Sequence, residues 1–222
     1  MPLSHFRCPD GVEIEADSCL SQCRLGQRCV TKATLLAIKN GEREWDGIPH
    51  VTQLLNGTML EFLRITKPYT VDPQDRAFAL LGSAHHKLLE EQEDSVIIPE
   101  IPFETDIAGT SDSLEWDDRL GGYILTDYKT WGSFRVAKAL GLVKEGKGKY
   151  ARFTQVEDRK DLHDVNLQLN MYRIGLEGTG WKPIKQLQVQ ATVRDGGTYM
   201  ARNNGIDKKI YTIPIDILLD DY

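Results

Sequence analysis

The chain has 222 residues, of which 41% are hydrophobic and 27% are charged, and its formal net charge is −6. It contains no apolar run of about 18 residues and no basic segment followed by an apolar one, so we expect a soluble, cytoplasmic protein without a membrane span or signal peptide. The size supports one sizeable α/β core with a small appended segment. The negative total does not favour nucleic-acid binding, which depends on lysine and arginine neutralising phosphates.

The N-terminal segment is distinguished by its cysteines. All four in the chain lie within the first 29 residues, at positions Cys8, Cys19, Cys23 and Cys29. Because the cytosol disfavours disulfides, four thiols so close together indicate a metal site, and both Zn²⁺ and an iron–sulfur cluster accept four thiolates. The spacing matches neither a common zinc ribbon nor a ferredoxin pattern. Structural zinc is the preferred interpretation, an iron–sulfur cluster is the alternative, and unligated thiols or disulfides come third.

Apolar spacing predicts three helices in the first half of the chain. The first covers 31–40 and the second covers 51–65. The third has Asp72 as its N-cap and Pro73 at its first position. The apolar stripe of the second helix is predicted to lie in the core; it comprises Leu54, Leu55, Met59, Phe62 and Leu63.

The third helix carries two adjacent histidines, His85 and His86. Neighbouring positions on a helix point in different directions, so only one imidazole can join a given site. A histidine satisfied inside a packing face is the ordinary interpretation for either of them.

The stretch 104–129 has the pattern of a β-hairpin, with two extended runs and a polar, glycine-containing turn at 117–122. Asp112 and Asp127 are equidistant from the midpoint of this turn. A symmetric register would make them direct cross-strand neighbours, with Cβ atoms about 4.5 to 5.5 Å apart.

Strand alternation then places Lys129 on the same side of the sheet as Asp127. Two carboxylates can bind Mg²⁺ or Mn²⁺, and such an ion beside a lysine is suited to hydrolysing a phosphodiester. A weak surface ion pair is the simpler alternative. The apolar residues before Asp127 indicate a buried strand, and charges that emerge from a core usually have partners.

The segment from Arg135 to Lys160 has eight basic residues against three acids, a local charge of +5. Its three glycines predict a mobile loop after a short helix, with a solvated surface as the alternative. A further helix is predicted from about 161 to Gly178 or Gly180, with Gln168 and Tyr172 one turn apart on one face. One or two more strands are predicted around a turn at 195–197.

Four short motifs occur in one order and together resemble the RecB-like PD-(D/E)XK nucleases, which include nuclease domains of bacterial recombination helicase–nucleases and CRISPR-associated RecB-like exonucleases. The resemblance covers roughly residues 78–177. It is carried by Gly82 to His86 with Glu90, the G-x-x-D of Gly109 to Asp112, the D-x-K of Asp127 to Lys129, and the Q-x-x-x-Y of Gln168 to Tyr172.

The resemblance implies an α/β (α+β) fold in which 31–222 form a restriction-endonuclease-like core, a mixed central sheet flanked by helices, while 1–30 form the four-cysteine segment. It implies a Mg²⁺- or Mn²⁺-dependent deoxyribonuclease, expected to be an exonuclease, with DNA as its partner. Metal ligands would be His86, Asp112, Asp127 and the backbone carbonyl of Tyr128. Lys129 would position the attacking water, while Gln168 and Tyr172 would support the site and contact the DNA backbone. Separately from the resemblance, the local positive charge predicts that DNA phosphates contact Lys144, Lys147, Lys149 and Arg152.

One feature departs from the family. Members with four-cysteine clusters usually have one cysteine before the nuclease core and three after it, and their cluster is iron–sulfur. Here all four precede the core, which favours zinc. Two other functions stay open: a non-catalytic DNA-binding or assembly module that retains the fold, and a zinc-stabilised interaction protein in which the D-x-K is coincidental.

Overall fold

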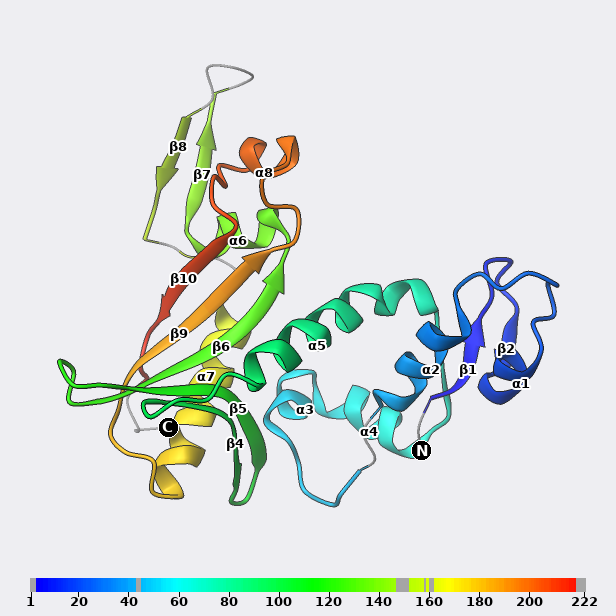
Figure 1. Cartoon of the computed structure of the whole chain (residues 1–222), viewed down its shortest axis with the longest axis horizontal. Coiled ribbons are helices and arrows are strands. Elements are labelled where there is room, and N and C mark those ends of the chain that lie inside the picture. Colours follow the sequence, from blue (N-terminus) through cyan, green and yellow to red (C-terminus); the bar gives the residue numbers. More distant parts are fainter. Residues whose placement is uncertain (1–2, 43–44, 147–151, 158, 160–161, 219–222) are drawn as a thin grey trace. The chain divides into compact units, whose positions relative to one another are not determined.

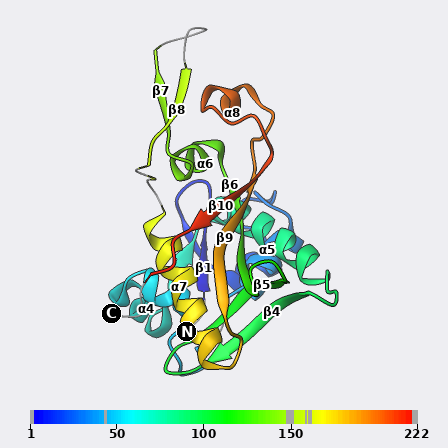
Figure 2. The same ribbon diagram turned by 90° about the vertical axis from the view of Figure 1, so that its left-hand side faces the viewer.

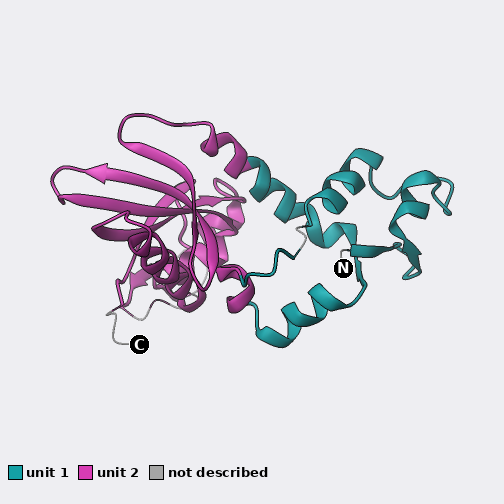
Figure 3. Ribbon diagram, turned by 90° about the horizontal axis from the view of Figure 1, so that it is seen from below, with its two compact units in different colours: residues 1–49, 56–84 teal, residues 50–55, 85–222 magenta. Residues whose placement is uncertain are grey.

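A computed structural model describes residues 3–42, 45–146, 152–157, 159 and 162–218 (Figure 1). The chain divides into two compact units, one formed by 1–49 with 56–84 and the other by 50–55 with 85–222 (Figure 3). The predicted boundary after residue 30 falls inside the first unit. Among the helices in the described ranges, none combines the length and apolar character needed to cross a membrane.

The first unit contains a three-stranded sheet in the order β2-β1-β3. β1 (Leu3–Arg7) pairs antiparallel with β2 (Glu13–Glu15) and parallel with β3 (Tyr69–Val71). Two helices complete this unit's core, α1 (Ala16–Ser21) and α2 (Lys32–Asn40). The prediction of α2 is confirmed, with Thr31 as its N-cap and Gly41 at its end. The core of the first unit includes Leu3, Phe6, Leu20, Leu35 and Ile38.

The second predicted helix is two helices, α3 (Val51–Leu55) and α4 (Thr58–Thr66). They are separated at Gly57, whose φ of +92° is readily adopted by glycine alone. The prediction that its apolar stripe lies in the core is wrong for α4, which has no buried residue: Met59 is 70% exposed and Phe62 is 57% exposed.

The third predicted helix begins as expected. The Asp72 side chain accepts a hydrogen bond from the Gln74 backbone N–H at 2.9 Å, and proline follows the cap. The first turn is a short 3₁₀ helix, η1 (Pro73–Arg76), which continues into α5 (Ala77–Glu90). The last part of α5, from His85 onward, belongs to the second unit.

The second unit is built on a five-stranded sheet in the order β10-β9-β6-β5-β4 (Figures 1 and 2). β6 and β9 are parallel and the other neighbouring pairs are antiparallel, so the sheet is mixed. The prediction of a mixed α/β fold whose central sheet is flanked by helices is confirmed at this level. The strands are β4 (Ile97–Glu104), β5 (Ala108–Asp117), β6 (Gly122–Trp131), β9 (Ile184–Val193) and β10 (Ile210–Ile215).

The β5–β6 hairpin has the predicted turn and register. Asp117 pairs with Gly122 at the turn, and the ladder continues to Ser113 and Thr126. The Asp117 carboxylate fixes the turn by accepting backbone N–H bonds from Arg119 at 2.7 Å and Leu120 at 3.2 Å. The symmetry that the sequence predicts about this turn is therefore confirmed.

Helix α7 (His163–Gly178) packs against the sheet and fills the core of the second unit. Its Leu169 and Leu176 are fully buried. Close packing depends on Gly175, where an added Cβ would lie 2.2 Å from a ring carbon of Phe103 on β4. The predicted helix is confirmed, with Gly178 as its last residue.

The remaining elements of the second unit are short. The predicted short helix is α6 (Ser133–Ala139). The prediction of a mobile loop after it is wrong for the described residues, because β7 (Leu142–Glu145) and β8 (Arg152–Gln155) form an antiparallel pair there. Residues 147–151 of that loop lie outside the described residues. The sequence also did not predict α8 (Tyr199–Asn203), which lies between β9 and β10.

The packing of α7 gives a first prediction. Gly175→Ala should lower the free energy of unfolding by about 1–3 kcal/mol, because the new methyl group overlaps the Phe103 ring. Gly178→Ala in the same helix is the control, since its Cβ would meet only Thr105 at 4.0 Å; we expect no loss and a gain of up to about 1 kcal/mol. Urea unfolding measures both, and equal effects would contradict this packing.

Candidate metal centre

Two acidic residues stand opposite each other on β4 and β5. The pairs on either side of Glu100 place it across from Asp112, although the two do not themselves form a regular backbone pair. These flanking pairs are Pro99 with Ser113 and Ile101 with Ser111. Directly opposed like charges destabilise a sheet unless a positive charge compensates them.

A third acid continues the row on β6. The β5–β6 ladder ends at Ser113 and Thr126, and the next step along both strands brings Asp112 opposite Asp127. Asp112 also contacts β6 directly, because its Oδ2 accepts a hydrogen bond from the Tyr128 N–H at 2.6 Å. Carboxylates therefore extend across three adjacent strands.

His86 of α5 approaches the middle of this row. Its Nδ1 lies 3.5 Å from Oδ1 of Asp112, and the hydrogen bond with Asp112 raises the pKa of His86 above its ordinary value. His86, Glu100 and Asp112 each offer one ligand atom, and these three atoms lie within 4.8 Å of one another. Imidazole nitrogen and carboxylate oxygen both bind divalent cations.

Glu100 was not predicted from the sequence, which did not identify β4 either. The available signal was a glutamate inside the apolar run IIPEIPF. Its two prolines fit an edge strand, the position that β4 occupies. A charged residue in such a run is a candidate ligand once the neighbouring strand is known.

Asp127 and Lys129 form a pair on the same side of β6, as predicted. Asp127 is 2% exposed, and both of its oxygens lie 2.8 Å from the Lys129 ammonium. Burial raises the pKa of Asp127 to about 6; the Lys129 charge opposes this shift and the Asp112 charge adds to it. In the described part of the chain, Asp127 is not among the three closely grouped ligands.

His85 has a different environment from His86, as the helical positions predict. Its Nε2 lies 3.3 Å from Thr192 Oγ1 on β9, and its ring meets that of Tyr128 edge-on at 6.4 Å. Burial lowers the pKa of His85, which favours the neutral imidazole. Tyr128 itself pairs with Gln190 of β9, and its carbonyl stays a predicted ligand.

Gln168 and Tyr172 lie on α7 in the core. Gln168 is 8% exposed and donates a hydrogen bond to the Tyr172 hydroxyl at 3.0 Å. The Tyr172 ring, 5% exposed, meets Phe103 edge-on at 5.8 Å. These positions fit a supporting role better than a contact with the DNA backbone.

The structure describes only two of the four residues that are predicted to contact phosphates, Lys144 and Arg152. Lys144 on β7 donates hydrogen bonds to the side chain and carbonyl of Asn203, at 2.6 and 3.2 Å, which ties β7 to the end of α8. Arg152 is exposed on β8. Lys147 and Lys149 lie outside the described residues.

The four cysteines line one small cavity in the first unit, and all are free thiols. Cys8 and Cys19 are buried, which raises the pKa of each thiol. Cys23 is partly buried and Cys29 is exposed. Arg24 and Arg28 line the same cavity, and their positive charges favour thiolates. The only group in the described ranges with three ligand atoms within 4.8 Å is His86, Glu100 and Asp112.

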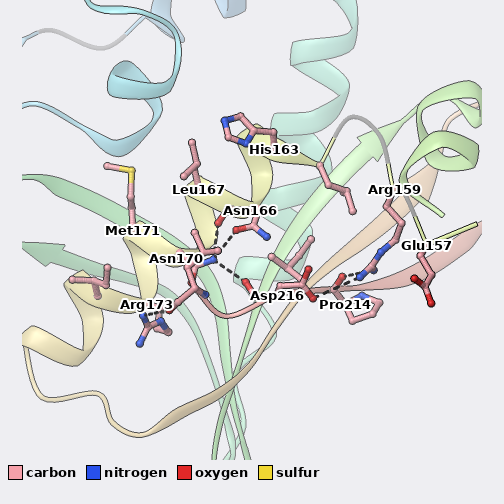
Figure 4. A pocket seen from close by; sticks show the side chains of 14 residues that line it. Glu157, Arg159, His163, Asn166, Leu167, Asn170, Met171, Arg173, Pro214 and Asp216 are labelled. Carbon is pink, nitrogen blue, oxygen red and sulfur yellow. Dashed lines mark hydrogen bonds and ion pairs between the residues drawn. The ribbon is translucent and has the colours of Figure 1, made fainter. Parts of the chain in front are cut away.

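A separate pocket of about 830 Å³ lies between α7 and the end of β10 (Figure 4). Asn170 crosses it by donating a hydrogen bond to the carbonyl of Asp216 at 2.9 Å. Its lining includes Leu167 and Met171 and none of the three acids of the row. The pocket is therefore distinct from the candidate metal centre.

Comparison with protein-family models gives no match for this sequence, and neither does a search of curated proteins. The class of this protein is therefore defined only by its fold and by the side chains gathered on its sheet. The chain is a mixed α/β protein in which Glu100, Asp112, Asp127 and Lys129 lie on the central sheet and His86 of α5 approaches Asp112.

The buried pair gives a second prediction. Lys129→Met, studied with a chelator present, should lower the free energy of unfolding by about 1–3 kcal/mol, because it leaves the Asp127 charge buried and unpaired. Adding Asp127→Asn should recover part of this loss, whereas Lys185→Met on an exposed position of β9 should have little effect. Strictly additive effects of the two site substitutions would show that the pair is not coupled.

Proposed function

We propose that this protein is a metal-dependent deoxyribonuclease with a restriction-endonuclease-like core, hydrolysing phosphodiester bonds and acting as an exonuclease. The observation that carries the proposal is the approach of His86 to Asp112 beside the buried pair of Asp127 and Lys129. The four motifs that resemble RecB-like nucleases supply these residues, and the β5–β6 register draws two of the motifs together.

The proposed metal is Mg²⁺ or Mn²⁺. His86, Asp112, Asp127 and the Tyr128 carbonyl would hold it, a set dominated by the oxygen ligands that these cations prefer. When bound, the cation supplies charge that polarises a phosphate and lowers the pKa of a coordinated water.

The protein's own groups supply the remaining functions. The Lys129 ammonium, 24% exposed in its side chain, can donate to a water or to a phosphate oxygen while it stays bound to Asp127. Asp112 is held in place by the Tyr128 N–H, so its second oxygen stays directed toward His86. Gln168 and Tyr172 support the strands from α7.

DNA is the proposed substrate because the segment from Arg135 to Lys160 has a local charge of +5 in a chain that is negative overall. Arg152 is exposed there, and Lys144 is anchored to Asn203. A non-catalytic DNA-binding or assembly module is the second candidate, favoured by the same basic segment. It would bind DNA without cutting it.

We also propose structural zinc at Cys8, Cys19, Cys23 and Cys29, with an iron–sulfur cluster as the alternative. The proposal is supported by the chemistry of the donors, because four free thiols line one cavity beside two arginines. No three of these four sulfurs, all in the described part of the chain, lie within 4.8 Å of one another, so the segment would close around the metal on binding. A metal there would stabilise a unit whose hydrophobic core is small.

Cleavage of end-labelled linear DNA and of circular DNA, with Mg²⁺ or Mn²⁺, tests the nuclease proposal and separates exonuclease from endonuclease action. Asp112→Asn and Lys129→Ala should each lower cleavage by about 10²–10³-fold, because each removes charge that acts on the reacting phosphate. Asp106→Asn, on an exposed position of the β4–β5 loop, is the control and should cleave normally. Retained DNA binding without cleavage by the wild-type protein would establish the non-catalytic module instead.

The cysteine site is tested by metal content. Cys23→Ser should lose bound metal and lower the melting temperature, because it removes one of four ligands from the site. Ser21→Ala, nearby and exposed, should retain both properties. Elemental analysis distinguishes zinc from iron, and a visible absorption band indicates an iron–sulfur cluster. Purified protein that contains neither metal and melts like Cys23→Ser would contradict the proposal.

A further inference from the structure

The row of acids brings three carboxylates close together on adjacent strands. Lys129 lies against Asp127, at one end of the row. Glu100 and Asp112 stand opposite each other at the other end, with the His86 ring between α5 and the sheet. Opposed carboxylates on adjacent strands repel, so a cation at this end would stabilise the arrangement.

The backbone at Glu100 is unusual. Its φ of +48° makes it the one non-glycine with a positive φ among the residues whose placement is described. Only a few per cent of non-glycine residues adopt this region, and those that do are concentrated at functional sites. Glycine would relieve the strain, but it would remove the carboxylate.

The ligand geometry fits a single ion. The His86, Glu100 and Asp112 ligand atoms lie within 4.8 Å of one another. An octahedral cation with ligands at about 2.1 Å holds neighbouring ligands about 3.0 Å apart and opposite ligands about 4.2 Å apart, so the three side chains would close by up to about 2 Å to bind it. Three ligands leave the other positions of an octahedral ion open for water and phosphate.

Asp127 is already paired with a positive charge, because both of its oxygens lie 2.8 Å from the Lys129 ammonium. Its Oδ2 is buried and accepts no hydrogen bond from the described residues, although the Lys129 ammonium is 2.8 Å away. Buried carboxylate oxygens normally accept hydrogen bonds or bind metal. The Lys129 ammonium already compensates this charge, and among the described residues Asp127 is not part of the group formed by His86, Glu100 and Asp112.

From these observations we infer that Glu100 is a metal ligand. The divalent cation is held by His86, Glu100 and Asp112, while Asp127 stays outside this ligand set and is bound to Lys129. This inference rests on the proposed nuclease function and changes its ligand assignment: one of the two acids of the D-x-K hairpin is replaced by an acid from the edge strand.

The test is Mn²⁺ binding to the 222-residue chain, monitored by electron paramagnetic resonance. Glu100→Gln should weaken Mn²⁺ binding by at least about 10–100-fold. Removing a residue that only supports a metal ligand already causes a loss of this size, and removing a ligand should cost no less. Glu104→Gln, at the exposed end of the same strand, should bind as the wild type does. Asp127→Asn should weaken binding less than Glu100→Gln does.

A second variant separates ligation from a structural role. Glu100→Gly should lose Mn²⁺ binding as Glu100→Gln does, yet raise the melting temperature of the metal-free protein by about 2–4 °C, because glycine adopts the positive φ without strain. A melting temperature that falls would mean that the Glu100 side chain serves the fold, and would overturn the inference.

The outcomes distinguish the inference from the function on which it rests. Normal Mn²⁺ binding by Glu100→Gln, with binding lost in Asp112→Asn, would overturn the role of Glu100 and leave the nuclease proposal intact. A wild-type protein that binds no Mn²⁺ at millimolar concentration would overturn both. Loss in Glu100→Gln and Asp112→Asn, with retention in Glu104→Gln, supports the inference.

Discussion

The structure of the second unit depends on the alignment of β4, β5 and β6, because this alignment places three carboxylates in one row. A slip of one residue in either pairing would turn a carboxylate to the opposite face of the sheet. The β5–β6 pairing is fixed at the turn, where the Asp117 carboxylate accepts two backbone N–H bonds. The turn therefore fixes the register that places Asp112 beside Asp127 at the other end of the hairpin.

Packing inside the second unit holds these strands in place. Helix α7 lies close to the sheet because Gly175 leaves room for the Phe103 ring, and Phe103 belongs to the same strand as Glu100. Asp127 is charged and buried on the central strand β6, a position that a fold tolerates when a partner such as Lys129 is present. The pair of Asp127 and Lys129 thus stabilises the fold, and it is compatible with a cation held by His86, Glu100 and Asp112.

Local signals in the sequence predicted several elements of both units. The symmetric hairpin, the cap at Asp72 and the helix ending at Gly178 follow from turn, capping and periodicity rules that depend on neighbouring residues. Glu100 could not be predicted in this way, because its partner Asp112 lies on another strand and its positive φ leaves no local pattern. The exposed stripe of α4 shows the same limit: periodicity predicts an apolar face but does not say what covers it.

The central claim is that a divalent cation binds to this row of acids, and the most direct measurement is anomalous diffraction from crystals of the 222-residue chain soaked in Mn²⁺. The account predicts a peak within bonding distance of His86, Glu100 and Asp112, beside an intact pair of Asp127 and Lys129. A fully occupied peak elsewhere, with none in contact with Asp112, would contradict it.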